Sequence, residues 1–523
     1  MRRQQGVSQG RWSATSADPG REGNAIISTK RSRIIGTTVV VAGTTAALVA
    51  AAAPATTAAA GQPQPSLRLA AATSAVTLDS YDGQVTLDLG THVVAGDKPF
   101  EIRAKRPNYT KPIVASHVAD GKETALPAGL VTSFEGLSRF LHFTVTNSAG
   151  RVVAQRDQVF CPNGDTARTR PDAPDRSPYP EYCGDNPFTL GGVWGIQKGW
   201  STATGGGPEV KLPVGTYTAT VFIRQAYRDA FAIPASQAAV TVRVTVRKGH
   251  DGGDAGHDGA RDGGHDKAFR RAGLTGLQPG ARPTGTPRVP DGPKPDLRPL
   301  PAWEIGIDHG DADAHAAVRD YLHFSADVWN AGPSPLVLDG FRRSGQRLMD
   351  AYQYFYDSTG KQVGYAPTGT LEWDPREGHT HWHFTDFASY RLLNANKTQV
   401  MRSQKEAFCL AATDAIDFTV KNANWHPPNT DLHTACGGES SLSVREVLDV
   451  GSGDTYVQAL PGQSFDVTRL PNGTYYIQVV ANPAKRLYEA TTANNVSLRA
   501  VVLGGRPGHR TVKVVPYGSV HTP

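Results

Sequence analysis

Short runs in which apolar and polar residues alternate recur along most of the chain, and they predict β-strands rather than helices. Gly, Pro and Asn separate these runs, as in β-sandwiches, where short strands alternate with turns. In the first half of the chain the runs are residues 76–78, 85–89, 141–145, 215–223 and 240–246. The sequence therefore predicts an all-β protein in which residues 67–248 form an N-terminal, immunoglobulin-like β-sandwich of unassigned role.

The same pattern returns after Trp303 and continues to about Val502. Residues 321–328 alternate over their whole length, and residues 475–480 form a further β-run after a Pro-Asn-Gly turn. Helical periodicity is scarce, and Ser440–Leu448 is its strongest candidate. We expect a second, β-sandwich-like domain over residues 301–505, followed by a disordered tail at 506–523.

Residues 249–300 differ in composition from both flanking regions. Three His-Asp pairs lie in a tract rich in Gly and Asp, and a Pro-rich stretch follows from Pro279 to Pro301. Such composition is typical of a linker that is flexible first and stiffer afterwards. The His-Asp pairs could bind a metal weakly, but a solvated spacer is the favoured interpretation.

The first 66 residues predict export. Residues 1–33 hold seven Lys and Arg against two acidic residues, and residues 34–53 are uncharged and rich in Ala, Val and Thr. A basic stretch, an apolar stretch and a small-residue segment follow one another in secretory signals. The alternative is an uncleaved membrane anchor, because about 20 apolar residues can span a bilayer.

Charge and cysteine content narrow the function classes further. The leader accounts for +5 of the net charge of +6, so the rest of the chain is close to neutral. The sequence therefore gives no sign of the basic surface by which folded domains bind nucleic acids. The four cysteines are Cys161, Cys183, Cys409 and Cys436. An even number in an exported protein predicts disulfides. The pairing 161–183 and 409–436 is the most direct of three possible connectivities.

The run Gly378–Phe384 carries three histidines at alternate positions, His379, His381 and His383. Alternate residues share one face of a strand, whereas on a helix they would diverge. Neutral imidazoles suit Cu, Zn, Fe or Ni. In an ideal strand the outer Cα atoms would be about 13 Å apart, so one ion can bind all three only if the segment bends. A strand face with packed or solvated histidines is the alternative.

Several segments between Tyr321 and Asn495 resemble the lysyl oxidase family. Each match is short, and their shared order and spacing argue against chance. The segments are Trp373 with His379–His383, Asp386 with Tyr390–Asn396, Lys405–Leu410, Asp454–Tyr456, Pro471–Tyr475, Asn482–Pro483 and Asn494–Asn495. Residues 1–300 are not covered by the resemblance.

The resemblance implies a secreted, bacterial-type, copper-dependent amine oxidase. His379, His381 and His383 would bind Cu(II), and Lys405 and Tyr456 would be the two halves of lysine tyrosylquinone, a cofactor made from the protein's own side chains. Such an enzyme oxidises primary amines, including lysines of proteins, to aldehydes with O₂ and releases ammonia and hydrogen peroxide. Asp386 is a candidate catalytic base, and orientation of a histidine is an equal alternative for it.

The chain departs from vertebrate members of the family at several points. Gly378 replaces a cysteine, and Gln404 and Ser389 replace histidines. Vertebrate members also have many more cysteines, and some carry scavenger-receptor modules that are absent here. Because residue 389 is a serine, the role that a histidine would have at this position is not expected here.

Two other functions remain open. A non-catalytic, secreted β-sandwich surface protein with a structural His₃ metal site would bind copper or zinc without forming a quinone. A His₃ zinc hydrolase would use metal-bound water as its nucleophile and would not need Lys405. The physiological substrate is not predicted, and the N-terminal domain is a candidate for cell-surface association.

Overall fold

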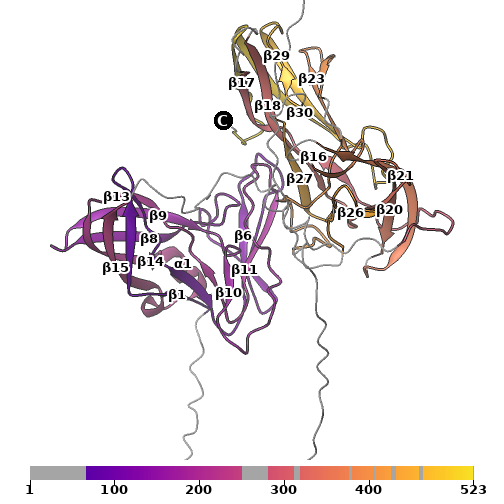
Figure 1. Cartoon of the computed structure of the whole chain (residues 1–523). Coiled ribbons are helices and arrows are strands. Elements are labelled where there is room, and N and C mark those ends of the chain that lie inside the picture. Colours follow the sequence, from indigo (N-terminus) through magenta and orange to yellow (C-terminus); the bar gives the residue numbers. More distant parts are fainter. Residues whose placement is uncertain are drawn as a thin grey trace, which may run out of the picture. The chain divides into compact units, whose positions relative to one another are not determined.

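The computed structural model describes residues 66–249, 281–310, 318–357, 359–375, 380–403, 407–425, 432–458 and 463–521. Nearly all regular structure in these ranges is β, with one α-helix, α1 (Gln225–Phe231), and one short 3-10 helix, η1 (Ala235–Gln237) (Figure 1). The all-β expectation is confirmed. None of the helices within these ranges is both long and apolar enough to cross a membrane. The predicted signal segment lies outside the described residues.

Four sheets make up the N-terminal domain. Their strand orders are β2 (Ala75–Ser80), β15 (Ala239–Lys248), β14 (Gly215–Ile223), β8 (Leu137–Asn147), β9 (Val152–Phe160); β1 (Leu67–Ala71), β4 (Thr91–Ala95), β12 (Trp200–Ala203), β10 (Thr166–Arg168); β11 (Gly191–Ile196), β5 (Phe100–Lys105), β6 (Val114–Ala119), β7 (Lys122–Ala125); and β13 (Glu209–Lys211), β3 (Gln84–Thr86).

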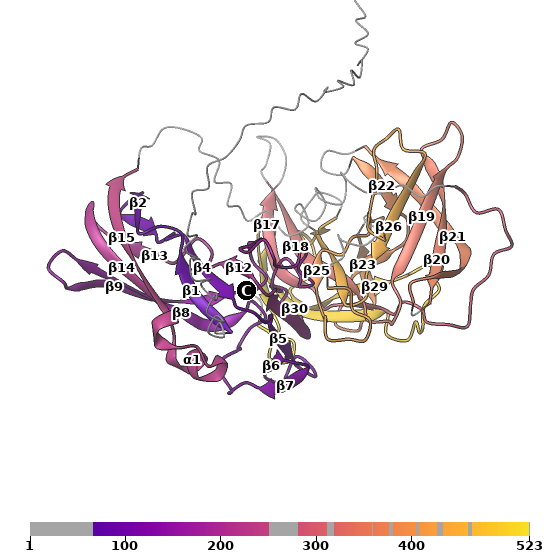
Figure 2. The ribbon, with the colours of Figure 1, turned by 90° about the horizontal axis from the view of Figure 1, so that it is seen from below.

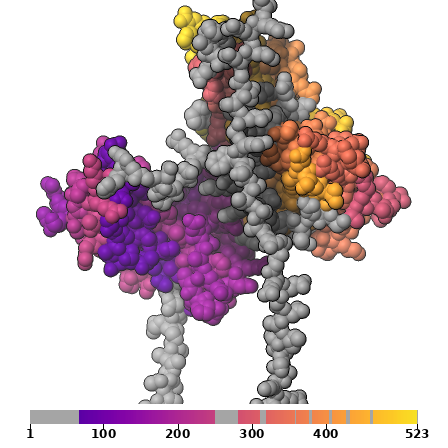
Figure 3. Space-filling view, in the orientation of Figure 1, coloured from indigo at the N-terminus to yellow at the C-terminus, as the bar shows by residue number. Residues whose placement is uncertain are grey.

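Alternation explains how these strands pack. On β15, Val242, Val244 and Val246 are buried, whereas the intervening Thr and Arg residues are exposed. One face of the strand therefore joins the hydrophobic cluster of this domain, and the other faces solvent. The solvent-facing surface of the domain is the indigo-to-magenta area of Figure 3.

Three further sheets belong to the C-terminal part. The first contains β16 (Leu297–Pro299), β18 (Arg319–Asn330), β27 (Ser452–Val457) and β25 (Asp414–Ala415), with β17 (Trp303–Gly310) and β28 (Phe465–Asp466) also paired to β18. The second runs β22 (His381–Phe384), β21 (Gln362–Asp374), β20 (Leu348–Tyr356), β19 (Leu336–Arg342), β26 (Ser443–Leu448), and Figure 2 shows its strands side by side. The third runs β24 (Gln399–Arg402), β23 (Ala388–Leu393), β29 (Gly473–Ala481), β30 (Val496–Arg506), β31 (His509–Val514). One hydrophobic cluster joins side chains from all three sheets.

Both domains contain the sequence Leu-Pro-X-Gly-Thr-Tyr at the start of a long strand. In β14 the Tyr217 hydroxyl donates to the carbonyl of Pro213 at 2.8 Å. In β29 the Tyr475 hydroxyl donates to the carbonyl of Pro471, also at 2.8 Å. Each tyrosine thus fixes the loop that leads into its own strand, as tyrosine corners do in β-sandwiches.

Two sequence-based expectations are wrong. Residues 443–448, inside the expected helix Ser440–Leu448, form β26, because pairing with β19 buries Val444, Val447 and Leu448. Tertiary pairing here outweighs local helical periodicity. The tail expected to be disordered contains β31, which pairs with β30 through residues 509–514.

The Pro-rich end of the predicted linker packs against the second sheet. Arg282 pairs with Asp350 at 2.6 Å, and the backbone N–H of Arg288 donates to the carbonyl of Tyr365 at 2.8 Å. Further along, β16 pairs with β18. Residues 281–299 therefore contribute contacts to the C-terminal domain, and the earlier His-Asp pairs lie outside the described residues.

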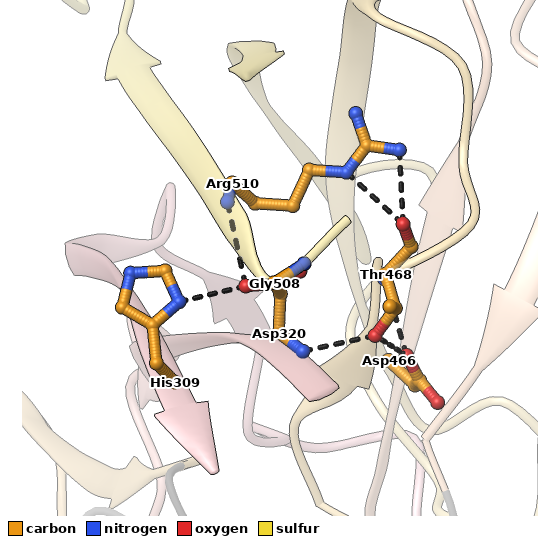
Figure 4. Close-up of polar contacts among 6 residues, drawn as sticks. All are labelled: His309, Asp320, Asp466, Thr468, Gly508 and Arg510. Atoms are coloured by element: carbon orange, nitrogen blue, oxygen red, sulfur yellow. Dashed lines mark hydrogen bonds and ion pairs between the residues drawn. The ribbon is translucent and has the colours of Figure 1, made fainter. Parts of the chain in front are cut away.

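A buried carboxylate fastens the β30–β31 hairpin to the first sheet (Figure 4). Asp320 on β18 accepts hydrogen bonds from the backbone N–H groups of Gly508 at 2.7 Å and Arg510 at 3.3 Å, and its carboxylate lies 2.7 Å from Nδ1 of His309. Burial alone would raise the pKa of Asp320, but these hydrogen bonds together lower it below its usual value. The carboxylate is therefore held in its charged form.

Replacing Asp320 with Asn will destabilise the fold by about 2–3 kcal/mol, because hydrogen bonds to a charged acceptor contribute most and an amide offers only one acceptor oxygen. Denaturant unfolding at pH 7 measures this difference. Since the pKa of Asp320 is lowered in the folded state, its contribution is present above the unfolded value of about 3.9 and is lost as the pH falls through the folded pKa. The variant and the parent should therefore converge in acid.

The matched control is Asp308→Asn, whose carboxylate is 59% exposed and lies 3.6 Å from His323. This variant should change stability by less than about 0.5 kcal/mol, as exposed ion pairs contribute little. Equal losses in the two variants would contradict the role given to Asp320.

Candidate functional site

The described part of the histidine run contains the short edge strand β22 (His381–Phe384), whose register with β21 is fixed. Trp382 pairs with Trp373, and His381 pairs with Asp374. Trp382 and Phe384 belong to the hydrophobic cluster, so His381 and His383 project from the opposite face of β22. Their ring centroids are 4.2 Å apart, and both residues are buried. Two of the three predicted ligands thus share one face, as the alternation predicted.

Asp374 lies beside this imidazole pair. Its Oδ2 is 3.8 Å from Nδ1 of His383, and both side chains are buried. Carboxylates commonly hold the second ring nitrogen of a metal-ligating histidine and so fix its orientation. Sequence reasoning missed Asp374, although its position next to Trp373 at the end of a strand leading into the histidine run was an available signal.

The donor set fits a metal that prefers nitrogen ligands. The two adjacent imidazoles of His381 and His383 supply nitrogen donors of the kind that Cu or Zn accepts, and Asp374 lies beside them rather than acting as a third ligand. Within the described ranges, no group of three His, Cys, Asp or Glu side chains comes close enough to hold a metal ion. His379, the third predicted ligand, lies outside those ranges.

The edge of β22 that does not pair with β21 bonds to two other segments of the chain, around Phe408 and around Cys436. The N–H of Trp382 donates to the carbonyl of Cys436 at 3.2 Å. Phe384 and Phe408 exchange two backbone hydrogen bonds of 2.6 and 2.9 Å. A disulfide joins Cys409 to Cys436, and the other joins Cys161 to Cys183, which confirms the predicted pairing. Closing a loop of 27 residues stabilises the fold by about 3–4 kcal/mol in the chain-entropy description.

Tyr456 on β27 contacts the segment around Phe408. Its hydroxyl is 3.2 Å from the backbone N of Cys409 and 3.3 Å from the carbonyl oxygen of Cys409. Its ring meets Phe408 edge-on, with centroids 4.5 Å apart at an angle of 90°. Lys405 lies outside the described residues, three positions before Phe408. The described chain therefore brings Phe408 and Cys409, which follow Lys405 in the sequence, to the Tyr456 ring.

The surroundings of Tyr456 keep its phenol neutral. Burial raises its pKa well above the usual value, and the nearby carboxyl groups of Asp454 and Glu446 raise it further. Glu446 is fully buried on β26, and its Oε2 accepts the backbone N–H of Leu410 at 3.2 Å. Burial also raises the pKa of Glu446 well above its usual value. A lone Glu in a segment predicted to be helical gave no sequence signal for this position.

Asp386, the candidate base, lies in the turn after β22. Its backbone adopts a left-handed conformation with φ of 60°, and its carboxylate faces Arg486, with Nη1 and Oδ2 3.5 Å apart. Its side chain is 31% exposed. The carboxylate beside His383 is thus that of Asp374, and the role of Asp386 stays a prediction.

Comparison with known proteins relates part of this chain to lysyl oxidases. A sequence model described as Lysyl oxidase matches residues 343–509. Lysyl oxidase homolog 2A of Danio rerio is 30% identical over 183 residues, covering 35% of this chain and 19% of the relative. Lysyl oxidase homolog 2 of Gallus gallus is 28% identical over 179 residues, covering 34% and 20%. Lysyl oxidase homolog 4 of Homo sapiens is 30% identical over 132 residues, covering 25% and 15%.

The matched segment includes β22, the Cys409–Cys436 disulfide and Tyr456, whereas the N-terminal domain lies outside it. The chain spans about a fifth of the length of the relatives named here, or less. Residues 343–509 are therefore similar to the lysyl oxidase family.

Proposed function

We propose that the protein is a copper-dependent amine oxidase. A primary amine, O₂ and water would give an aldehyde, ammonia and hydrogen peroxide, so that two electrons pass from the carbon–nitrogen bond to oxygen. The observation that carries the proposal is the position of Phe408 and Cys409. Phe408 exchanges hydrogen bonds with Phe384 of the histidine strand and packs against the Tyr456 ring, and the backbone of Cys409 contacts the Tyr456 hydroxyl. The two residues follow Lys405 by three and four positions.

The residues of the chain have distinct roles in this proposal. His379, His381 and His383 would hold Cu(II), and Asp374 would fix the orientation of the His383 ring. Lys405 and Tyr456 would be the source of lysine tyrosylquinone, whose carbonyl chemistry activates the amine carbon for oxidation. Asp386 remains the candidate for the base that takes a proton from that carbon.

Export and the range of substrates are parts of the same proposal. The uncharged stretch 34–53 after a basic leader, together with two disulfides, supports an oxidising, extracellular location. Primary amines, including lysine side chains of other proteins, would be the substrates. The N-terminal domain would then be available for association with a cell surface.

A second candidate is a non-catalytic protein with a structural metal site. The burial of Tyr456 and its hydrogen bonds to the Cys409 backbone favour this alternative, since the same contacts suit a packed core tyrosine. Copper or zinc would still bind, but no amine would be oxidised.

Tyr456→Phe and Lys405→Arg should each reduce amine turnover of the copper-loaded protein to the level of the copper-free protein, because both proposed halves of the cofactor are required. Peroxide release with a primary amine measures turnover. The matched controls are Tyr390→Phe, a fully buried tyrosine of the same cluster, and Lys397→Arg. Unchanged turnover in Tyr456→Phe or Lys405→Arg would contradict the proposal and favour the structural metal site.

Asp374→Asn should weaken copper binding about 10–100-fold, as is typical when the carboxylate partner of a metal-ligating histidine is lost. Competition titration of the copper-free protein against a chelator measures the affinity. Asp357→Asn, a change in the loop between β20 and β21, should leave the affinity unchanged. If both variants bind copper like the parent, Asp374 does not support the metal site.

A further inference from the structure

The described residues from 66 to 521 belong to one compact unit, and the segment 413–418 has partners in both domains. On one side it pairs with the strand that carries Tyr456. The N–H of Thr413 donates to the carbonyl of Gly453 at 2.9 Å, and the N–H of Ile416 donates to the carbonyl of Gly451 at 3.0 Å. These bonds make the segment a neighbour of β27 in the sheet.

On its other side, the segment bonds to the N-terminal domain. The N–H of Leu190 donates to the carbonyl of Ile416 at 2.7 Å, and the N–H of Phe418 donates to the carbonyl of Gly191 at 2.9 Å. Gly191 and Asp417 form a parallel bridge. The first residue of β11 therefore extends the sheet of the C-terminal domain across segment 413–418.

Side chains of the N-terminal domain add two more hydrogen bonds to the same segment. The Tyr182 hydroxyl donates to the carbonyl of Thr413 at 3.0 Å, and the Thr189 hydroxyl donates to the carbonyl of Ala415 at 3.1 Å. The carbonyl groups of Thr413, Ala415 and Ile416 thus accept hydrogen bonds from the N-terminal domain, whereas the N–H groups of Thr413 and Ile416 donate to Gly453 and Gly451. Because unpaired buried backbone groups are costly, removal of either side would destabilise the segment.

Hydrophobic packing crosses the same boundary. One cluster joins Phe188 of the N-terminal domain to Trp303, Trp329 and Ile416. A second cluster joins Tyr179 and Val193 to Ala415 and Phe418. In both clusters the apolar side chains come from the two domains together. Separation of the domains would expose aromatic surface on each, which favours a permanent contact over a loose tether.

Segment 413–418 lies between the N-terminal domain and the proposed site and bonds to both. It begins four residues after Cys409, whose backbone contacts the Tyr456 hydroxyl. It pairs with β27 at Gly453, three residues before Tyr456. Segment 413–418 therefore connects the residues that follow Cys409 to β27, the strand that carries Tyr456.

From these contacts we infer that the N-terminal domain is an intramolecular clamp. It holds segment 413–418 against β27, so that the backbone of Cys409 keeps its contact with the Tyr456 hydroxyl. The inference rests on the proposed function where it concerns formation of the cofactor, but the clamp itself does not. The domain would then be part of the catalytic unit rather than a detachable surface module.

The test uses full-length protein with a wedge at Gly191. A methyl group at this position would lie 2.1 Å from Oδ1 of Asp417 and 2.6 Å from Oγ1 of Thr419. Asp417 Oδ1 accepts the N–H and the hydroxyl of Thr419 at 3.0 and 2.6 Å, so displacement of these two side chains by Gly191→Val should break this turn and loosen the segment, while valine suits a β-strand position in its own domain. The matched control is Gly206→Val in the same domain, where the nearest atom, a methyl of Thr86, is 3.9 Å away.

Hydrogen exchange reports on the clamp without reference to activity. Gly191→Val should speed exchange in residues 411–425 by about tenfold or more, and Gly206→Val should not. In the copper-loaded protein, Gly191→Val should also lower the content of phenylhydrazine-reactive cofactor by about tenfold, with copper content unchanged. Adding Asp417→Ala and Thr419→Ala removes the atoms that the wedge meets and should restore both values towards those of the parent.

Three outcomes separate the possibilities. Normal exchange in Gly191→Val would overturn the clamp. Fast exchange with a normal cofactor content would show that the contact does not serve the site, and would overturn its proposed role. If the parent itself forms no cofactor while Gly191→Val still exchanges fast, the proposed function fails and the clamp stands as a structural element.

A protease site inserted within residues 255–265 gives an independent readout. After cleavage, the two halves of the parent should co-elute in size-exclusion chromatography, and those of Gly191→Val should separate. Separation of the halves of the parent would overturn the clamp.

Discussion

The candidate site depends on the hydrogen bonding of both edges of β22. One edge pairs with β21, and the other bonds to Phe408 and to Cys436. The Cys409–Cys436 disulfide joins these two segments, so neither can leave the strand alone. With both edges fixed, the alternation of a β-strand decides which side chains enter the hydrophobic cluster and which face the other way.

This arrangement gives β22 two chemically different faces. His381 and His383 occupy one face, with Asp374 beside them. Trp382 and Phe384 occupy the other and share a hydrophobic cluster with Phe408 and Tyr456. The proposed chemistry requires groups from both sides, and Phe408–Cys409 is the described segment that contacts both the strand and the phenol. Lys405, three positions before Phe408, carries the amine on which the account depends.

Local patterns predicted part of this structure. Alternation identified the all-β class, the strand that holds His381 and His383, and several long strands in each domain. Cysteine spacing led to the observed disulfides. In contrast, the helical pattern at Ser440–Leu448 was overruled by pairing with β19, which no local pattern reveals.

Long-range contacts account for most of what the sequence did not predict. Asp374 and Glu446 acquire their significance from strand register and burial: Asp374 had only its position next to Trp373 as a local signal, and Glu446 had none. The contacts between Gly191 and segment 413–418 join residues more than two hundred positions apart. A single sequence carries little information about such pairings, whereas the three-histidine run was recognisable because its spacing and its chemistry coincide.

The central claim is that an amine and a phenol of this chain combine beside a copper ion. A mass spectrum of a proteolytic digest of the copper-matured protein tests it most directly. The account predicts that the peptides containing Lys405 and Tyr456 appear as one covalently joined species, which is absent from protein kept free of copper. Recovery of both peptides separate and unmodified after copper loading would contradict the account.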